Sequence, residues 1–215
     1  MCLGLLSNLK KKINMAKANW LKVDPSQGSG NATVNVSSTV EHTGRKARTT
    51  TLTWKAANVA DVVRNVSQAG KPEYVDIADA AAADKAGKVV TIIGASNSAK
   101  LTFSLGTGDL TEITLPSTYT ANSVNTSNGA AISGDPGALA EYNFSISITV
   151  PANDDITAKT RQIIVEDEAG NRDVCTLTSA AGDAYVTVQE GTIELDYLGT
   201  PVPWTVESNT SWTIE

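Results

Sequence analysis

The stretch GTIELDYLGTPVPWTVESNTSWTIE (residues 191–215) decides the fold, because we expect it to begin a domain that it does not complete. Apolar and polar side chains alternate along it in three short runs, the pattern of β-strands with one buried face. A three-stranded piece of this size is only marginally stable in water, so a second segment must cover its apolar face. The apolar residues of the three runs are Ile193, Leu195, Tyr197, Val202, Trp204, Val206, Trp212 and Ile214.

Residues 19–68 are also predicted to form only part of a domain, and the part that they lack is the one that residues 191–215 would supply. Turn-forming sequences, DPSQGSGN and EHTGRK, divide this block into four predicted strands. Placing the block after Glu215 gives one seven-stranded β-sandwich in a sensible order, so we interpret the two pieces as halves of a split domain. The predicted strands are 20–23, 32–37, 49–55 and about 61–68, and their inward-facing residues include Val34, Val36, Leu52 and Trp54. We expect Trp54 to pack in the core beside Leu52, whereas Trp20 is either a core residue or an exposed interface residue.

In that order, the joined sequence resembles the BACON repeat, an Ig-like module common in Bacteroidetes surface proteins and their phages. The resemblance rests on SNTSW (208–212), WLKVDPSQG (20–28), a turn containing Arg45 and Arg48, and VVRNVSQAG (62–70). It implies an Ig-like fold. By analogy with the accessory proteins of crAss-like tailed phages that infect Bacteroides, it also implies an auxiliary (decoration) protein of a capsid.

The whole chain is therefore predicted to be all-β, with tandem Ig-like β-sandwiches, one of them split between the two ends. The predicted parts are a basic apolar N-terminal arm (1–17), the C-terminal part of the split sandwich (18–70), a central Ig-like sandwich (71–190) and the N-terminal strands of the split sandwich (191–215).

Alternation is clearest in the central part, where residues 142–150 (YNFSISITV) predict a strand with one apolar face. Further expectations there are a strand at 100–105, a hairpin at 161–178 that turns at 169–171, a short helical turn between residues 74 and 88, a long polar loop at 119–140, and a strand at 184–189 that closes the sandwich.

Charge argues against nucleic-acid binding by the folded part. The formal net charge is −6; residues 1–17 contain four lysines and no acid, which leaves 13 basic and 23 acidic residues, or −10, for the rest. We expect neither an export signal nor a membrane span, because the first apolar run is short and precedes the lysines. We also expect Cys2 and Cys175 to be free thiols.

The N-terminal arm places Leu3, Leu6 and Ile13 on one side of a short helix and Lys10, Lys11 and Lys12 on the other. Two interpretations stay open. The arm is either a frayed tail, with an alternative start at Met15, or a docking arm that orders on a partner such as the major capsid protein.

Catalytic chemistry has little support, so we expect no enzyme, no cofactor and no metal site. His42 is predicted to be a solvated loop residue. The acidic groups near Asp154 and Glu166 lack any calcium-loop spacing and are interpreted as solubilising turns. Arg45, Lys46 and Arg48 are interpreted as protection of a strand edge, with an acidic partner surface as the alternative.

The split domain can close within one chain or between chains, and we favour closure between chains, head to tail, giving a homo-oligomer. The predicted function is a structural virion protein on the capsid surface, made in the host cytoplasm, with the major capsid protein and further copies of itself as partners. The alternative is a carbohydrate-binding adhesion module of BACON type, for which glycans would be the ligands.

Overall fold

The computed structural model describes residues 17–215, and the regular structure of these residues is β apart from one short 3-10 turn. The chain divides into two compact units. The N-terminal unit runs up to His42 and includes 46–70; the C-terminal unit comprises 43–45 and 71–215. The all-β fold class predicted from the sequence is confirmed.

The described residues form fifteen strands. They are β1 (Leu21–Asp24), β2 (Asn35–Ser38), β3 (Arg48–Trp54), β4 (Val62–Gln68), β5 (Val75–Ile77), β6 (Ala80–Ala83), β7 (Lys88–Ser96), β8 (Leu101–Gly108), β9 (Thr118–Ala121), β10 (Val124–Ser127), β11 (Tyr142–Val150), β12 (Lys159–Asp167), β13 (Arg172–Ser179), β14 (Val186–Val188) and β15 (Val206–Ser208), and the 3-10 turn η1 is Pro136–Ala138.

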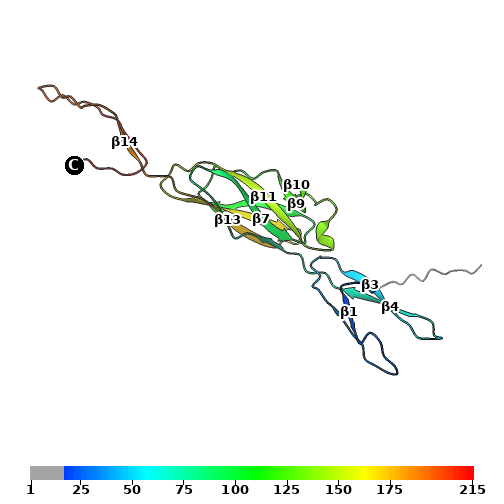
Figure 1. Cartoon of the computed structure of the whole chain (residues 1–215). Helices are drawn as coiled ribbons and strands as arrows, with labels where there is room; N and C mark the ends of the chain where they lie inside the picture. The colour runs from blue at the N-terminus through cyan, green and yellow to red at the C-terminus, as the bar shows by residue number, and fades with distance from the viewer. Residues whose placement is uncertain (1–16) are drawn as a thin grey trace, which may run out of the picture. The chain divides into compact units, whose positions relative to one another are not determined.

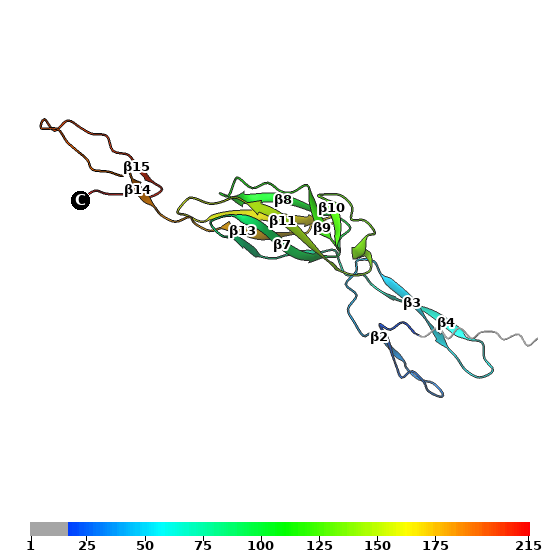
Figure 2. The same cartoon turned by 45° about the horizontal axis from the view of Figure 1, so that its top comes forward.

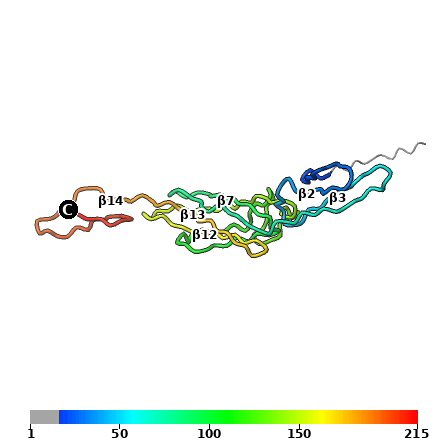
Figure 3. Tube along the Cα trace, turned by 90° about the horizontal axis from the view of Figure 1, so that it is seen from below, coloured from blue at the N-terminus to red at the C-terminus, as the bar shows by residue number. Residues whose placement is uncertain are grey.

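Strands β5 to β13 form a β-sandwich in the C-terminal unit (Figure 1). One sheet has the order β10-β9-β11-β7-β5 and the other the order β6-β13-β12-β8. Figure 3 shows β7 on one side of this sandwich and β12 on the other. All neighbouring strands are antiparallel except β6 and β13, which are parallel.

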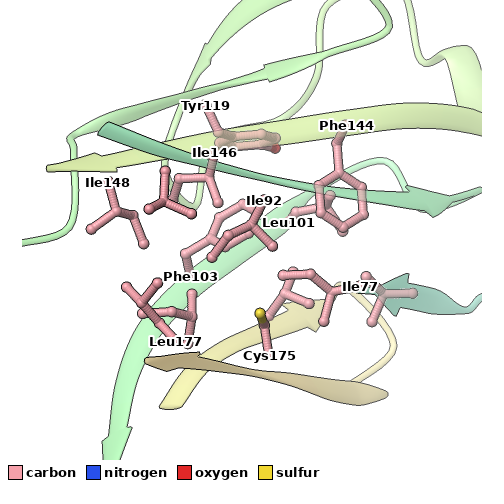
Figure 4. Packing of buried hydrophobic residues seen from close by; sticks show 14 of the residues in the cluster. Ile77, Ile92, Leu101, Phe103, Tyr119, Phe144, Ile146, Ile148, Cys175 and Leu177 are labelled. Carbon is pink, nitrogen blue, oxygen red and sulfur yellow. The ribbon is translucent and has the colours of Figure 1, made fainter. Parts of the chain in front are cut away.

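The core of the sandwich lies between the inward faces of these sheets. In Figure 4, Ile92, Phe144 and Ile146 from one sheet point toward Phe103 and residues of the other sheet. The ring of Phe103 contacts that of Tyr119, with the ring centroids 5.0 Å apart. This packing follows from the alternation in the sequence. Each second residue of β11 is buried, as predicted for residues 142–150.

Three predictions for the central part are wrong. Residues 184–189 do not close the sandwich, because β14 pairs only with β15, in a separate ladder (Figure 2). The stretch 119–140 is not one long loop, since it contains β10 and the end of β9. The expected helical turn between residues 74 and 88 is replaced by β5 and β6. The short strands β5, β6 and β14 pair with β7, β13 and β15 further along the chain, whereas β9 and β10 pair with each other across a tight turn. The β12–β13 hairpin and the strand that begins near residue 100 are confirmed.

The N-terminal unit consists of two hairpins, β1–β2 and β3–β4, each a two-stranded ladder of its own. The four strands lie within a few residues of their predicted positions. Arg48 links the hairpins. It donates a hydrogen bond to Gln68 Oε1 at 2.9 Å and another to the carbonyl of Val40 at 3.1 Å, and its guanidinium group lies 4.5 Å from the ring centroid of Trp20.

Candidate assembly site

The N-terminal unit contains a groove of about 560 Å³ between its two hairpins. Val23 of β1, Val34 just before β2, and Leu52 and Trp54 of β3 supply apolar parts of its lining. Leu52 is 8% exposed, whereas Trp54 is 42% exposed. Two two-stranded hairpins do not enclose a core by themselves, and this groove is open to solvent.

The prediction that Trp54 is a buried core residue is wrong for the chain by itself, and so is the inward burial of Val36, which is 41% exposed. Val34 is half-buried. Trp54 lies on β3, Val36 on β2 and Val34 just before β2, but no second sheet covers them within the N-terminal unit. Trp20 is half-buried, with Arg48 against its ring.

Residues 191–215 are likewise uncovered. Tyr197 is 95% exposed, Leu195 62% and Ile193 53%; further along, Trp212 is 48% exposed and Ile214 83%. Within this segment only Val206–Ser208 pairs as a strand. Scattered exposed apolar residues are ordinary, but a run of them in one segment is unusual for the surface of a monomeric protein.

The free edge of this segment is open to strand pairing. Gln189 N–H donates to the carbonyl of Thr205 at 3.0 Å, so Thr205 directs its backbone polar groups toward β14. Residues 201–204 form no strand in the single chain. If they extended with the alternation that Thr205 begins, the nitrogens of Pro201 and Pro203 would face the β14 side, and the N–H and C=O groups of Val202 and Trp204 would face the other edge.

A compact turn precedes this edge. The carboxylate of Asp196 accepts hydrogen bonds from the N–H groups of Leu198 and Thr200 and from the Thr200 hydroxyl, at 2.7 to 3.0 Å. The bonds from Thr200, and then that from Leu198, hold the pKa of Asp196 below its ordinary value. The indole N–H of Trp204 donates to the carbonyl of Gln189 at 3.0 Å.

The two chain segments that connect to the sandwich lie at opposite ends of it. The carbonyl of Lys71 accepts from Asn97, the residue after the end of β7, whereas Gly182 N–H donates to the carbonyl of Asp155, beyond the end of β11 that pairs with Lys88. Because β7 has nine residues, its ends are about 27 Å apart.

Asn97, which is fully buried, organises the first of these ends. Its Oδ1 atom accepts from Tyr74 N–H at 3.0 Å, and its Nδ2 group lies within 3.1 to 3.3 Å of the carbonyl oxygens of Thr43, Lys71 and Pro72. We call this set the first clasp. Gly137 packs so closely on the Asn97 backbone that a Cβ atom would clash.

Asn209 makes the corresponding bonds at the other end. Its Oδ1 atom accepts from Tyr185 N–H at 3.0 Å, and its Nδ2 group donates to the carbonyls of Asp154 and Asp183, both at 2.9 Å. We call this set the second clasp. It fastens residues 185–209 to the Gly182 end of the sandwich.

The predictions for the basic turn are corrected. Arg45 does not protect a strand edge; it belongs to the C-terminal unit, where it forms ion pairs with Asp135 and Glu73 and donates to the carbonyl of Asn97. The hydrogen bond to Asp135 raises the pKa of Arg45 above its ordinary value. His42 is not solvated, being 5% exposed with Nε2 2.6 Å from the carbonyl of Lys46.

Residues 17–215 contain no group of His, Cys, Asp and Glu side chains suited to a metal ion, and no helix among them could cross a membrane. Cys175 is a free thiol, buried in the core, and burial raises its pKa. Cys2 and the predicted arm residues Leu3, Leu6, Lys10, Lys11, Lys12 and Ile13 lie outside the described residues.

Comparison with known proteins finds no family model that matches the chain and no curated protein that is significantly similar to it. The resemblance to BACON modules therefore stays a prediction from the motifs.

Sequence reasoning missed Asn97 and Asn209 as organising residues. A signal was present in the sequence, because Tyr-Val precedes each of them, at Tyr74 and Tyr185, and each follows a serine. Only the hydrogen bonds show that these short matches mark equivalent positions.

Proposed function

We propose that this protein is a structural subunit that joins copies of itself head to tail. Residues 191–215 of one copy complete the sandwich of residues 19–68 of the next by strand addition. The observation that carries the proposal is the matched exposure of the two segments. The groove beside Trp54 lacks a covering sheet, and the apolar residues of 191–215 lack a core.

The geometry of the C-terminal unit favours closure between copies. The second clasp holds Asn209 at the Gly182 end of the sandwich, about 27 Å from the end where Lys71 lies. Trp212 and Ile214 follow Asn209 by three and five residues, which reach at most about 10 and 17 Å when extended. The residues after Asn209 are therefore too short to return along their own sandwich to Lys71, unless the second clasp breaks.

The test is the mass of the assembled protein as a function of concentration, by analytical ultracentrifugation. We expect the full chain to form oligomers and a chain that ends at Glu190 to be monomeric. Labelling of Cys175 checks that the truncated chain keeps its sandwich, because Cys175 is buried in β13 and β14 is no part of the sandwich. Oligomers of unchanged size after truncation would rule out the proposal.

A matched pair of substitutions sharpens this test. Leu195 and Ile93 are 62% and 63% exposed, but Leu195 lies in the donated segment and Ile93 lies on the central sandwich. Truncating a large side chain that is buried at an interface costs about 2 to 3 kcal/mol, so Leu195→Ala should weaken association about 30- to 150-fold. Ile93→Ala should leave it unchanged.

The setting we propose for this assembly is the surface of a phage capsid, where the protein would act as an auxiliary protein that binds the major capsid protein lattice and links its own neighbours. Support comes from the resemblance to BACON-like accessory proteins and from the acidic charge of the part after residue 17. The test is co-sedimentation of the full chain with assembled capsids, compared with a chain that begins at Met15. Equal recovery of both would exclude the N-terminal arm as the docking element, and recovery of neither would exclude the capsid setting.

A further inference from the structure

The ladder between β14 and β15 repeats the ladder between β5 and β7. Val75 pairs with Ser96, and Val186 pairs with Ser208. The next two pairs along β5, from Asp76 and Ile77, recur at the corresponding positions of β14. Ser208 of β15 follows Ser96 of β7 by one residue more than Val186 of β14 follows Val75 of β5.

The two clasps repeat in the same way. In both, a serine hydroxyl donates to the carbonyl of the tyrosine at 2.8 Å, from Ser96 to Tyr74 and from Ser208 to Tyr185. In both, the next residue is the asparagine that accepts from the tyrosine N–H. Lys71 N–H donates to the carbonyl of Gly44, and Gly182 N–H donates to the carbonyl of Asp155. The second pair of residues lies as far along the chain from the first pair as Tyr185 lies from Tyr74.

The β3–β4 hairpin repeats the β12–β13 hairpin. Arg48 pairs with Gln68 and Lys159 with Ser179, and every pair of the β3–β4 ladder has its counterpart at this same offset in the β12–β13 ladder. The turn before each hairpin matches as well: the side chain of His42 contacts the carbonyl four residues ahead, and so does that of Asn153.

We infer that the chain contains an internal repeat in which Tyr74 and Tyr185 hold equivalent positions. The central sandwich is then the template for docking between copies: it gives the strand register in which residues 202–214 of one copy pack on β2 and β3 of the next. This inference rests on the proposed assembly. Residues 74–97 correspond to 185–209, and the strands β11, β12 and β13 correspond to the region of β2, β3 and β4. The segment that fills the groove beside Trp54 comes from a second copy of the chain. Residues after Tyr185 repeat the first strands of the central sandwich, and the β3–β4 hairpin repeats its last strands.

The template fixes individual pairs. Ile92 pairs with Ile146, and Val90 with Ile148, between β7 and β11. At the offset that relates Ser96 to Ser208, this predicts that Trp204 pairs with Val34 and Val202 with Val36. Both pairs would point into the groove that Val34 lines. The backbone edge of Val202 and Trp204 that faces away from β14 is the edge that β7 presents to β11.

The apolar pattern selects this offset for the strand near β2. It places Val34 and Val36 at the positions of Ile146 and Ile148, which are buried in the central sandwich. The offset of the β3–β4 hairpin would instead place Asn35 and Ser37 at those buried positions. Because a shift by a single position turns every side chain to the other face of a strand, only the first alignment keeps the apolar face inward.

One outward-facing pair makes the register measurable. Thr91 and Ser147 are partners on β7 and β11, and their hydroxyl oxygens are 2.9 Å apart. Their equivalents are Pro203 and Asn35. Side chains at such partnered positions are close enough for a disulfide bond.

The experiment mixes two full-length proteins in a Cys2→Ser background, one carrying Asn35→Cys and the other Pro203→Cys; the buried Cys175 is retained. We expect air oxidation to give a covalent heterodimer, in which mass spectrometry of the peptides identifies a disulfide between the two engineered positions. The control replaces Pro203→Cys by Thr205→Cys, which lies on the same face two residues along and should link at least tenfold more slowly.

The possible results separate this inference from the proposed function. Oligomers that link faster through Thr205→Cys, or through neither cysteine, would refute the register and leave strand donation standing. A protein that stays monomeric at all concentrations would refute both. A linked monomer is impossible in this design, because each chain carries one of the two engineered cysteines.

Discussion

Replacing Asn97 by alanine should destabilise the central sandwich, because this residue is fully buried and holds the first clasp. Its Oδ1 atom accepts one bond, from Tyr74, and its Nδ2 group has two hydrogens to share among three carbonyls, so about three bonds are lost. At about 1 kcal/mol each, the expected loss is about 3 kcal/mol of the free energy of unfolding.

The assay is urea unfolding followed by pulse labelling of Cys175. The four tryptophans, at positions 20, 54, 204 and 212, all lie outside β5–β13, so tryptophan fluorescence does not report on the sandwich. With a urea dependence of about 1.5 to 2 kcal/mol per molar for a domain of this size, Asn97→Ala should lower the midpoint by about 1.5 to 2 M.

Asn209→Ala is the matched control, because Asn209 accepts from a tyrosine N–H and donates to two backbone carbonyls at a half-exposed position. Water can replace those bonds, so the Cys175 midpoint should change by less than about 0.5 M. An unchanged midpoint in Asn97→Ala, or equal shifts in both variants, would show that the buried clasp does not stabilise the sandwich.

Three further predictions concern the assembly segments and the core. Tryptophan emission should shift to shorter wavelength as the protein concentration rises, since Trp54 and Trp212 are 42% and 48% exposed in the single chain; a constant spectrum alongside a rising mass would contradict burial of these rings. Native Cys175 should react with iodoacetamide at pH 8 at least a hundredfold more slowly than in urea, because burial raises its pKa and blocks access; peptide mapping separates it from Cys2. The turn at Asp196 should lose order as the pH falls below about 4, since a carboxylate with a lowered pKa stabilises the turn above its unfolded pKa and loses that effect as the pH falls through the folded value. The Leu198 and Thr200 amide shifts in NMR spectra report this loss, and Asp196→Asn should abolish the pH dependence.

Alternation along single strands could be interpreted correctly from the sequence because it depends only on neighbouring residues. It located β11 and the four strands of the N-terminal unit. Of the three strands predicted in residues 191–215, only the end of the second is formed, as Val206–Ser208. It could not assign β14, because a three-residue strand with valines at both ends fits any sheet that offers an edge.

Polar side chains were the least predictable from sequence. His42 and Arg45 lie in a turn that has the composition of a solvated loop, yet His42 is buried and Arg45 forms ion pairs with Glu73 and Asp135. Their partners lie between 4 and 90 residues away. Composition carries no information about such contacts, because a polar group is buried only where the fold supplies its hydrogen-bonding partners.

The sequence by itself determined that this protein is built from β-strands and that residues 19–68 and 191–215 carry apolar residues in alternation, since side-chain period and turn chemistry are local properties. Only the tertiary structure decided which strands pair, that β14 belongs with β15, and that Asn97 and Asn209 hold equivalent positions. The physical reason is that strand pairing depends on backbone hydrogen bonds between distant segments, and the same alternating pattern satisfies many possible partners until a closed core selects one.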